Sequence, residues 1–210
     1  MSAAEKTDAA ITQIPFDAEE NLDPSEVVPR PKLQREGSEP LWVFGYGSLM
    51  WDPGFPFEES RTTLLRGYHR AFCVWSHHYR GTREHPGLVL GLKRGGSCRG
   101  RAFRVAATDE PAVIDYLWRR ELLTGVYRPV LTQAQTDQGP VTALAFVADP
   151  HHTQYAGRLS ENAIVERIRF ATGARGPCRD YLVNTVRHLE EIGIRDKALH
   201  RLMQAVEGAA

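Results

Sequence analysis

The stretch LWVFGYGSLMW, residues 41–51, gives the first indication of the architecture. Its first half, Leu41–Tyr46, is an apolar run of strand length, and it passes directly into a turn that contains Gly47 and Ser48. Successive backbone N–H groups in such a turn can form a concavity that binds anionic or carbonyl oxygens. An ordinary tight turn is the alternative interpretation of the same pattern.

A dinucleotide-binding fingerprint is a further interpretation of these glycines. Gly45 and Gly47 match its first two glycines, but Met50 stands where the third would be. The fingerprint also requires a helix directly after the turn, whereas residues 51–54 contain a proline and a glycine that break the chain. The match is incomplete, and we predict no nucleotide cofactor.

Further short runs rich in Val, Phe, Leu and Thr follow, each bounded by Gly, Pro or Asp turns. The expected strands are Thr62–Leu65, Arg70–Ser76, Leu88–Leu92, Arg99–Val105, Arg128–Thr136 and Val141–Val147, with a hairpin turn at residues 137–140. Spacing, capping and stop signals predict helices from Thr108 to about Leu123, from Ser160 to Gly173, from Pro177 to Gly193, and over Asp196–Val206. This order predicts an α+β fold, a compact, mostly antiparallel sheet or small barrel flanked by helices.

Residues 1–38 differ in composition from the rest of the chain. They hold four prolines, many acidic residues and few aromatic ones. Such a segment buries too little apolar surface to offset the entropy lost on ordering. We therefore expect a flexible tail at residues 1–38, followed by one catalytic domain at residues 39–210.

The charge balance favours a small-molecule substrate over a nucleic acid. The chain has 26 basic and 26 acidic residues, so no excess of positive charge points to a polyanionic partner. The three cysteines are few and scattered, which argues for a reducing compartment. No signal peptide or membrane-length apolar run is apparent. We expect a cytoplasmic protein without a membrane partner, and the oligomeric state stays open.

Metal and thiol chemistry are weakly supported by the sequence. In His77–His78 and His151–His152, neighbours on a strand would point to opposite faces, so neither pair converges on one ion. Cys73 falls within an apolar strand, and Cys98 and Cys178 are expected in turns without an obvious base. We predict no metal site and no cysteine nucleophile.

Glu121 is the most informative residue of the first expected helix. Ile114 and Leu117 define an apolar stripe, and the next position of that stripe is occupied by Glu121. Desolvation on the core side and the nearby helix C-terminus both disfavour its negative charge, which raises the pKa of the carboxyl. Glu121 is thus a candidate acid/base. The alternative is a partly exposed glutamate in a structural ion pair with Arg119, Arg120 or another arginine.

Several motifs together resemble the γ-glutamylcyclotransferase superfamily, in its ChaC-like branch. The similar segments are residues 43–51, Arg66–Phe72, His78–Thr82 with Pro86-Gly87, Tyr116–Glu121 with Gly125–Tyr127, and Tyr155–Gly157. The resemblance covers roughly residues 41–206. Trp118 and Val126 depart from the family pattern, and they bear on the shape of the pocket rather than on a catalytic group.

The resemblance implies a barrel-like sheet with flanking helices and a cofactor-free lyase. The ChaC-like branch is associated with glutathione, which is converted to 5-oxoproline and Cys-Gly. Tyr46, Gly47, Ser48 and Leu49 would form the substrate-cradling loop, and Glu121 would be the acid/base. Tyr127 and Tyr155 match family tyrosines that line the pocket.

The chemistry of a γ-glutamyl group fits this residue set. Its own α-amine can attack the γ-carbonyl and close a lactam, so that no protein nucleophile or metal is needed and orientation supplies much of the rate. Arg80 is a candidate partner for the glycine carboxylate of the substrate, with a surface ion pair as the alternative. Other γ-glutamyl amines or amino acids as substrates, and a non-catalytic γ-glutamyl-binding role, are the alternative functions.

Overall fold

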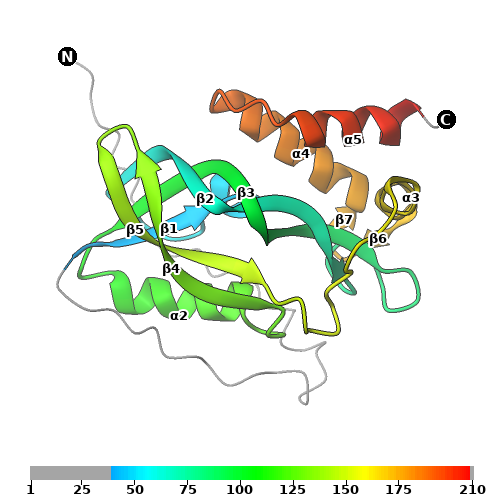
Figure 1. Ribbon diagram of the computed structural model, residues 1–210. Helices are drawn as coiled ribbons and strands as arrows, with labels where there is room; N and C mark the ends of the chain where they lie inside the picture. Colours follow the sequence, from blue (N-terminus) through cyan, green and yellow to red (C-terminus); the bar gives the residue numbers. More distant parts are fainter. Residues whose placement is uncertain (1–38, 209–210) are drawn as a thin grey trace.

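The computed structural model describes residues 39–208. The expected tail at residues 1–38 lies outside the described residues. The predicted catalytic domain at residues 39–210 coincides with the described part except for its last two positions. Within it, a small barrel is flanked by helices, which confirms the expected α+β class (Figure 1).

The barrel has five strands in the order β1-β3-β2-β4-β5. They are β1 (Leu41–Gly45), β2 (Glu59–Ser76), β3 (Gly87–Val105), β4 (Tyr127–Thr136) and β5 (Gly139–Ala148). Most neighbours are antiparallel, as expected, and the barrel closes where β1 runs parallel to β5. Closure removes the exposed sheet edges that would otherwise pair with other chains.

Two of the sequence-based boundaries were wrong because bulges bend strands without ending them. The segments 62–65 and 70–76, expected as separate strands, belong to the single strand β2, and 88–92 and 99–105 both belong to β3. The register of the β2–β3 pair shifts between Arg66 and Tyr68, at Gly67, whose φ is 83°. The extra residue of this bulge is on β3, where Gly95 and Gly96, with φ of 98° and 71°, stand opposite the single Gly67. Glycines adopt this left-handed conformation without steric cost.

Four α-helices follow the predicted order in the described part of the chain. They are α2 (Glu110–Glu121), α3 (Glu161–Phe170), α4 (Cys178–Glu191) and α5 (Lys197–Gly208), and a short 3-10 helix, η2 (Ser48–Met50), follows β1. Ser160 caps α3 as expected, since its Oγ accepts a hydrogen bond from Ala163 N at 3.3 Å. However, α3 ends at Phe170, and a small hairpin of β6 (Thr172–Gly173) and β7 (Gly176–Pro177) follows it.

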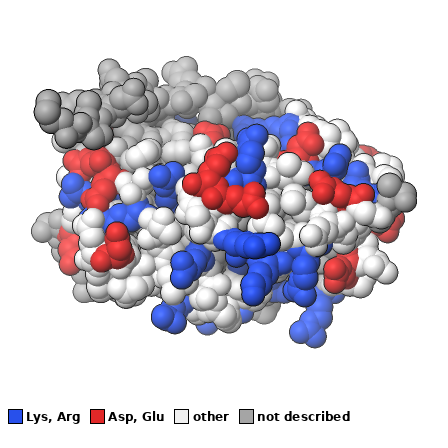
Figure 2. Space-filling model, turned by 90° about the horizontal axis from the view of Figure 1, so that it is seen from above, with Lys and Arg blue, Asp and Glu red and all other residues white. Residues whose placement is uncertain are grey.

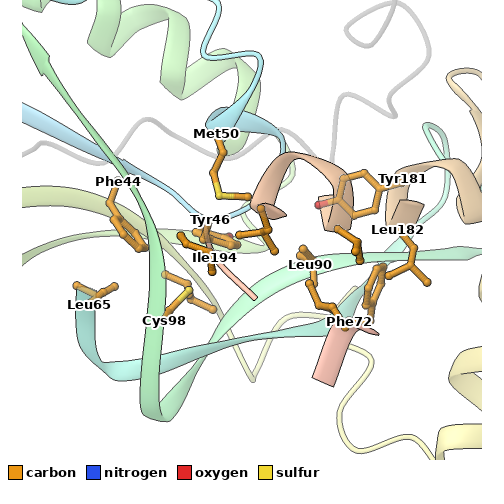
Figure 3. Packing of buried hydrophobic residues seen from close by; sticks show 14 of the residues in the cluster. Phe44, Tyr46, Met50, Leu65, Phe72, Leu90, Cys98, Tyr181, Leu182 and Ile194 are labelled. Atoms are coloured by element: carbon orange, nitrogen blue, oxygen red, sulfur yellow. The ribbon is translucent and has the colours of Figure 1, made fainter. Parts of the chain in front are cut away.

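The helices cover two sides of the barrel (Figure 1). α2 packs on one side, where Leu117 and Tyr116 join a cluster with β1 and β5. α4 and α5 lie on the opposite side, and Figure 3 shows Tyr181 and Leu182 of α4 directed toward Phe72 and Leu90 of the strands. The barrel therefore holds the end of α2 and the start of α4 at fixed positions.

The surface carries both signs of charge. On the face shown in Figure 2, Lys and Arg side chains lie beside Asp and Glu side chains, in keeping with the equal numbers of basic and acidic residues in the sequence. Within residues 39–208, no helix combines the length and the apolar character that crossing a membrane requires.

Candidate active site

A cavity of about 520 Å³ opens where the first strand, the end of α2 and the start of α4 meet. Its size lies within the usual range for small-molecule sites. Its lining comes from the loops after β1 and β2, the end of α2, strands β3 to β5, the β6–β7 turn, and α4. The lining residues are Tyr46, Gly47, Ser48, Leu49, Trp51, Asp52, His78, Tyr79, Arg80, Val89, Leu90, Arg120, Glu121, Tyr127, Phe146, Ala174, Arg175, Tyr181 and Asn184.

The turn after β1 forms one part of the lining and depends on its glycines. A Cβ atom at Gly45 would lie 3.0 Å from the backbone carbon of Leu49, and one at Gly47 would lie 3.0 Å from Tyr181 Oη. The chain can therefore turn sharply and approach α4 closely. Ser48 and Leu49 begin η2, and the first N–H groups of a helix have no acceptor within that helix. These donors stand at the cavity.

Glu121 lies at the last position of α2 and faces the cavity. Its side chain is 16% exposed, and its Oε1 is 3.2 Å from Arg120 Nε. Burial raises the pKa of the Glu121 carboxyl, and the neighbouring Arg120 charge only partly opposes this effect. The sequence offered two interpretations of Glu121, an acid/base with a raised pKa and a partner in an ion pair. The structure shows both, because the ion pair with Arg120 is formed and the pKa is still raised.

Arg120 connects Glu121 to the turn after β1. Its side chain is 11% exposed, and Nη2 donates to Ser48 Oγ at 3.1 Å while Nη1 donates to Asp52 O at 2.8 Å. Nη1 also donates to Tyr116 Oη at 2.8 Å. A planar guanidinium with several fixed partners is preorganised. Arg120 therefore sets the distance between the carboxylate and the turn.

Three tyrosines surround the carboxylate. Tyr46 Oη donates to the carbonyl oxygen of Phe146 at 2.9 Å, and Tyr127 Oη donates to the carbonyl oxygen of Leu90 at 2.8 Å. Burial is the main cause that raises the pKa of Tyr46, Tyr127 and Tyr181, with Glu121 adding to it in each case. All three stay neutral phenols. Since the hydroxyl hydrogens of Tyr46 and Tyr127 are engaged, their oxygens are left as acceptors.

Arg80 lies on the loop after β2, beside the β6–β7 hairpin. Its Nη1 donates to the carbonyl oxygens of Arg175 at 2.6 Å and Pro177 at 3.2 Å. Its guanidinium carbon is 5.6 Å from the centre of the Tyr181 ring. The alternative weighed from the sequence, a surface ion pair, is not seen for Arg80 among the described residues.

The structure brings most of the predicted site residues together. Tyr46, Gly47, Ser48, Leu49, Arg80, Glu121 and Tyr127 all line the cavity. Tyr155 does not; it forms an isolated bridge with Val74, and Lys93 Nζ lies 5.8 Å from the centre of its ring. A role for Tyr155 in the pocket stays a prediction.

Sequence reasoning did not single out several lining residues. Tyr181 and Asn184 come from α4, and Arg175 from the hairpin. Trp51 stacks on His188 of α4 with ring centres 4.9 Å apart. For Arg120 a signal existed, because it adjoins Glu121, but its bonds to the turn depend on packing across about 70 residues of chain.

The cysteines are buried, and the possible metal ligands of the described residues do not form a cluster. Cys73, Cys98 and Cys178 are all buried. Cys98 lies within β3 and Cys178 begins α4, so the expectation of turns was wrong for both. Burial raises the pKa of the Cys73 and Cys178 thiols to about 11. Within residues 39–208, no three His, Cys, Asp or Glu side chains gather in a way that could hold a metal ion.

Comparison with known proteins gives a consistent family. The family described as ChaC-like protein matches residues 41–209. The glutathione-specific gamma-glutamylcyclotransferase of Escherichia coli (strain K12) is 38% identical over 174 residues, 82% of this chain and 75% of that protein. The human glutathione-specific gamma-glutamylcyclotransferase 1 is 33% identical over 198 residues, 89% of each chain.

Solved structures agree on the fold. The crystal structure of a yeast gamma-glutamyl cyclotransferase specific to glutathione superposes with a TM-score of 0.76, covering 81% of this chain and 97% of that chain. Its sequence is 17% identical, so this likeness concerns the fold alone. The barrel with flanking helices is therefore an architecture already seen in an experimental structure.

Proposed function

The chain belongs to the ChaC-like family, and from this premise we propose that it is a glutathione-specific γ-glutamylcyclotransferase. It would convert glutathione to 5-oxoproline and Cys-Gly. The observation that carries the proposal is Glu121, a carboxyl with a raised pKa that lines the cavity together with Ser48 and Leu49, whose N–H groups begin the short helix η2. One bound substrate can therefore meet both a proton acceptor, the Glu121 carboxylate, and N–H donors for its carbonyl or carboxylate oxygens.

The reaction needs one intramolecular bond exchange. The α-ammonium of the γ-glutamyl group gives a proton to the Glu121 carboxylate, and the freed amine attacks the γ-carbonyl carbon. The new C–N bond closes the five-membered lactam, and the amide bond to cysteine breaks. The attacking nitrogen loses a second proton as the ring closes. Glu121 gives its proton to the departing nitrogen, and the second proton follows through the same carboxylate or through water, so that the products are the lactam N–H and the Cys-Gly ammonium. Such proton transfer typically contributes about 10²–10⁴-fold to the rate.

The surrounding groups would hold the substrate in the folded conformer. The acceptor oxygens of Tyr46 and Tyr127 suit the N–H groups of the α-ammonium. The N–H donors of the turn at Gly47, Ser48 and Leu49 suit either the α-carboxylate or the oxyanion that develops on the γ-carbonyl. Holding the reacting groups in this orientation can lower the activation free energy by up to about 7–11 kcal/mol.

The proposal includes three further properties. The reaction would need no cofactor, because the substrate carries its own nucleophile. The protein would act in the cytoplasm, in keeping with three unpaired cysteines. Its partner would be the small-molecule substrate, without nucleic acid or membrane.

Incubation of the purified protein with glutathione tests the function directly. We expect equimolar 5-oxoproline and Cys-Gly, with the same rate after treatment with a chelator. γ-Glutamyl-alanine and a γ-glutamyl amine serve as comparison substrates. Turnover of these and not of glutathione would favour the broader cyclotransferase activity. Binding of glutathione without 5-oxoproline would favour a non-catalytic role.

A further inference from the structure

The rim of the cavity carries two guanidinium groups, those of Arg80 and Arg175. They come from segments about 95 positions apart in the sequence, yet the backbone of Arg175 accepts a hydrogen bond from Arg80 Nη1 at 2.6 Å. The hairpin that carries Arg175 therefore also orients Arg80.

The hairpin is firmly attached at this place. Ala174 N donates to the carbonyl oxygen of His78 at 2.8 Å, and Arg175 N donates to that of Tyr79 at 2.9 Å. A Cβ atom at Gly173 would collide with the backbone of residues 78–81, so the two segments pack without intervening side chains. The position of the Arg175 backbone is thus fixed by the loop that carries Arg80.

Both guanidiniums lie against aromatic rings. Arg80 Cζ is 5.6 Å from the centre of the Tyr181 ring, and Arg175 Cζ is 4.9 Å from that of Tyr79. Stacking on a ring face engages the flat side of a guanidinium and leaves the N–H groups at its edge for an in-plane acceptor. A carboxylate is the acceptor that such an edge binds best.

No protein carboxylate fills this role within residues 39–208. The ion pairs there include neither Arg80 nor Arg175. Asp180 acts on Arg80 only from beyond ion-pair distance. Burial lowers the pKa of Arg80, and the neighbouring charge of Arg175 lowers it further. Arg80 is partly buried and Arg175 is exposed, and a partly buried cation beside a second cation is disfavoured when no carboxylate pairs with it. An anionic ligand would remove that cost.

We propose that Arg80 and Arg175 form a subsite for the terminal carboxylate of a γ-glutamyl peptide. The inference rests on the proposed function and makes this group the glycine carboxylate of glutathione. Cys-Gly spans at most about 7 Å beyond the scissile bond. Tyr181 lines the cavity together with Glu121, and its ring centre is 5.6 Å from Arg80 Cζ. The hairpin thereby selects peptides with a free terminus over γ-glutamyl amines.

The test compares substrates that differ at the terminus in two variants. The substrates are glutathione, its glycine ethyl ester and γ-glutamylcysteine. For Arg175→Gln we expect the KM for glutathione to rise about tenfold, the low end for a hydrogen bond to a charged group, with kcat nearly unchanged. The KM for the ester should not change. Arg179→Gln is the matched control, because Arg179 is exposed and pairs with Glu207 away from the cavity.

Two results would overturn the subsite. One is an equal wild-type KM for glutathione and its ester. The other is an equal rise for both substrates in Arg175→Gln. If the wild type releases no 5-oxoproline, the proposed function fails, and calorimetric binding of glutathione and ester to the same variants decides the subsite separately. Glutathione binding that is weakened both by the ester and by Arg175→Gln supports the subsite. Binding that is unchanged by the ester or by the substitution, or the absence of binding, refutes it.

Discussion

The wall of the cavity around Glu121 is held by buried side chains, whereas the opposite wall is held by backbone hydrogen bonds. We call Ser48, Arg120 and Glu121 the carboxylate wall, in which one guanidinium bonds both other residues. We call Arg80, Ala174 and Arg175 the hairpin wall, in which carbonyl groups hold the hairpin and orient Arg80.

The difference separates two tasks. A side-chain network loses several contacts when one member changes, so the carboxylate wall tolerates little substitution. A wall built on the backbone keeps its shape when a side chain changes, so the hairpin wall can vary its side chains and with them the substrate. We therefore expect substitutions to reduce kcat in the carboxylate wall and to raise KM in the hairpin wall.

The largest effect is expected for Glu121→Gln. Glutamine keeps the size of the side chain but cannot cycle a proton, so kcat should fall at least about 10²-fold. Glutathione should still protect the variant from thermal unfolding. Glu166→Gln, at an exposed helical position outside the cavity, is the control. A folded Glu121→Gln protein with near wild-type 5-oxoproline release would move the catalytic role elsewhere, with Tyr127 next to test.

A smaller effect, and a diagnostic one, is expected for Arg120→Gln. The guanidinium opposes the rise of the Glu121 pKa, so its loss should raise that pKa further. The acidic limb of the kcat profile should move to higher pH, because a neighbouring positive charge that favours the carboxylate is lost. In addition, kcat should fall roughly tenfold at neutral pH because the turn is no longer held.

Arg119→Gln is the control for that experiment, because Arg119 is its sequence neighbour and pairs with Asp115 on the exposed side of α2. Its pH profile should match the wild type. An Arg120→Gln protein that loses activity equally at every pH would mean that Arg120 acts through folding alone.

Gly47→Ala should affect stability more than chemistry. The added Cβ would stand 3.0 Å from Tyr181 Oη, and overpacking of this kind typically costs about 1–3 kcal/mol. Urea unfolding measures the loss. Removing the oxygen in Gly47→Ala/Tyr181→Phe should recover part of it, relative to Tyr181→Phe alone. Additive losses in the double variant would show that the turn and α4 do not press on each other.

These two walls also show how far the sequence predicts the molecule. The turn at Gly47 and the carboxyl at Glu121 were accessible because each is a local pattern, one a glycine turn after a strand and the other a charge on an apolar stripe. The hairpin at residues 172–177 was not, since its strands have two residues each and the sequence pattern predicts the end of a helix at Gly173. Tyr181 and Arg175 become site residues only through packing between distant segments.

The boundaries of the long strands β2 and β3 also depend on pairing between distant segments. Gly67 was interpreted as a break between two strands, but pairing with β3 continues past it through a bulge. A glycine in the sequence marks a change of backbone direction, and only the partner strand decides whether pairing ends there. Element types were therefore predictable, whereas boundaries set by tertiary pairing were not.

The smallest expected effect concerns the pH dependence of stability. The pKa of Glu121 is raised in the folded protein by burial, from an ordinary value of 4.5. As the pH rises above that value, the unfolded chain releases the proton while the folded protein still holds it. The folded state then binds more protons, so the free energy of unfolding falls with rising pH until the folded pKa is passed.

Glu121→Gln lacks this dependence, and the comparison with the wild type isolates it. The variant's free energy of unfolding minus that of the wild type should increase as the pH rises from about 4.5 through the raised pKa, and then stay constant. The rise amounts to about 1.4 kcal/mol for each unit of pKa difference. Urea titrations at several pH values measure it, and parallel curves would mean that the carboxyl of Glu121 has an ordinary pKa in the folded protein.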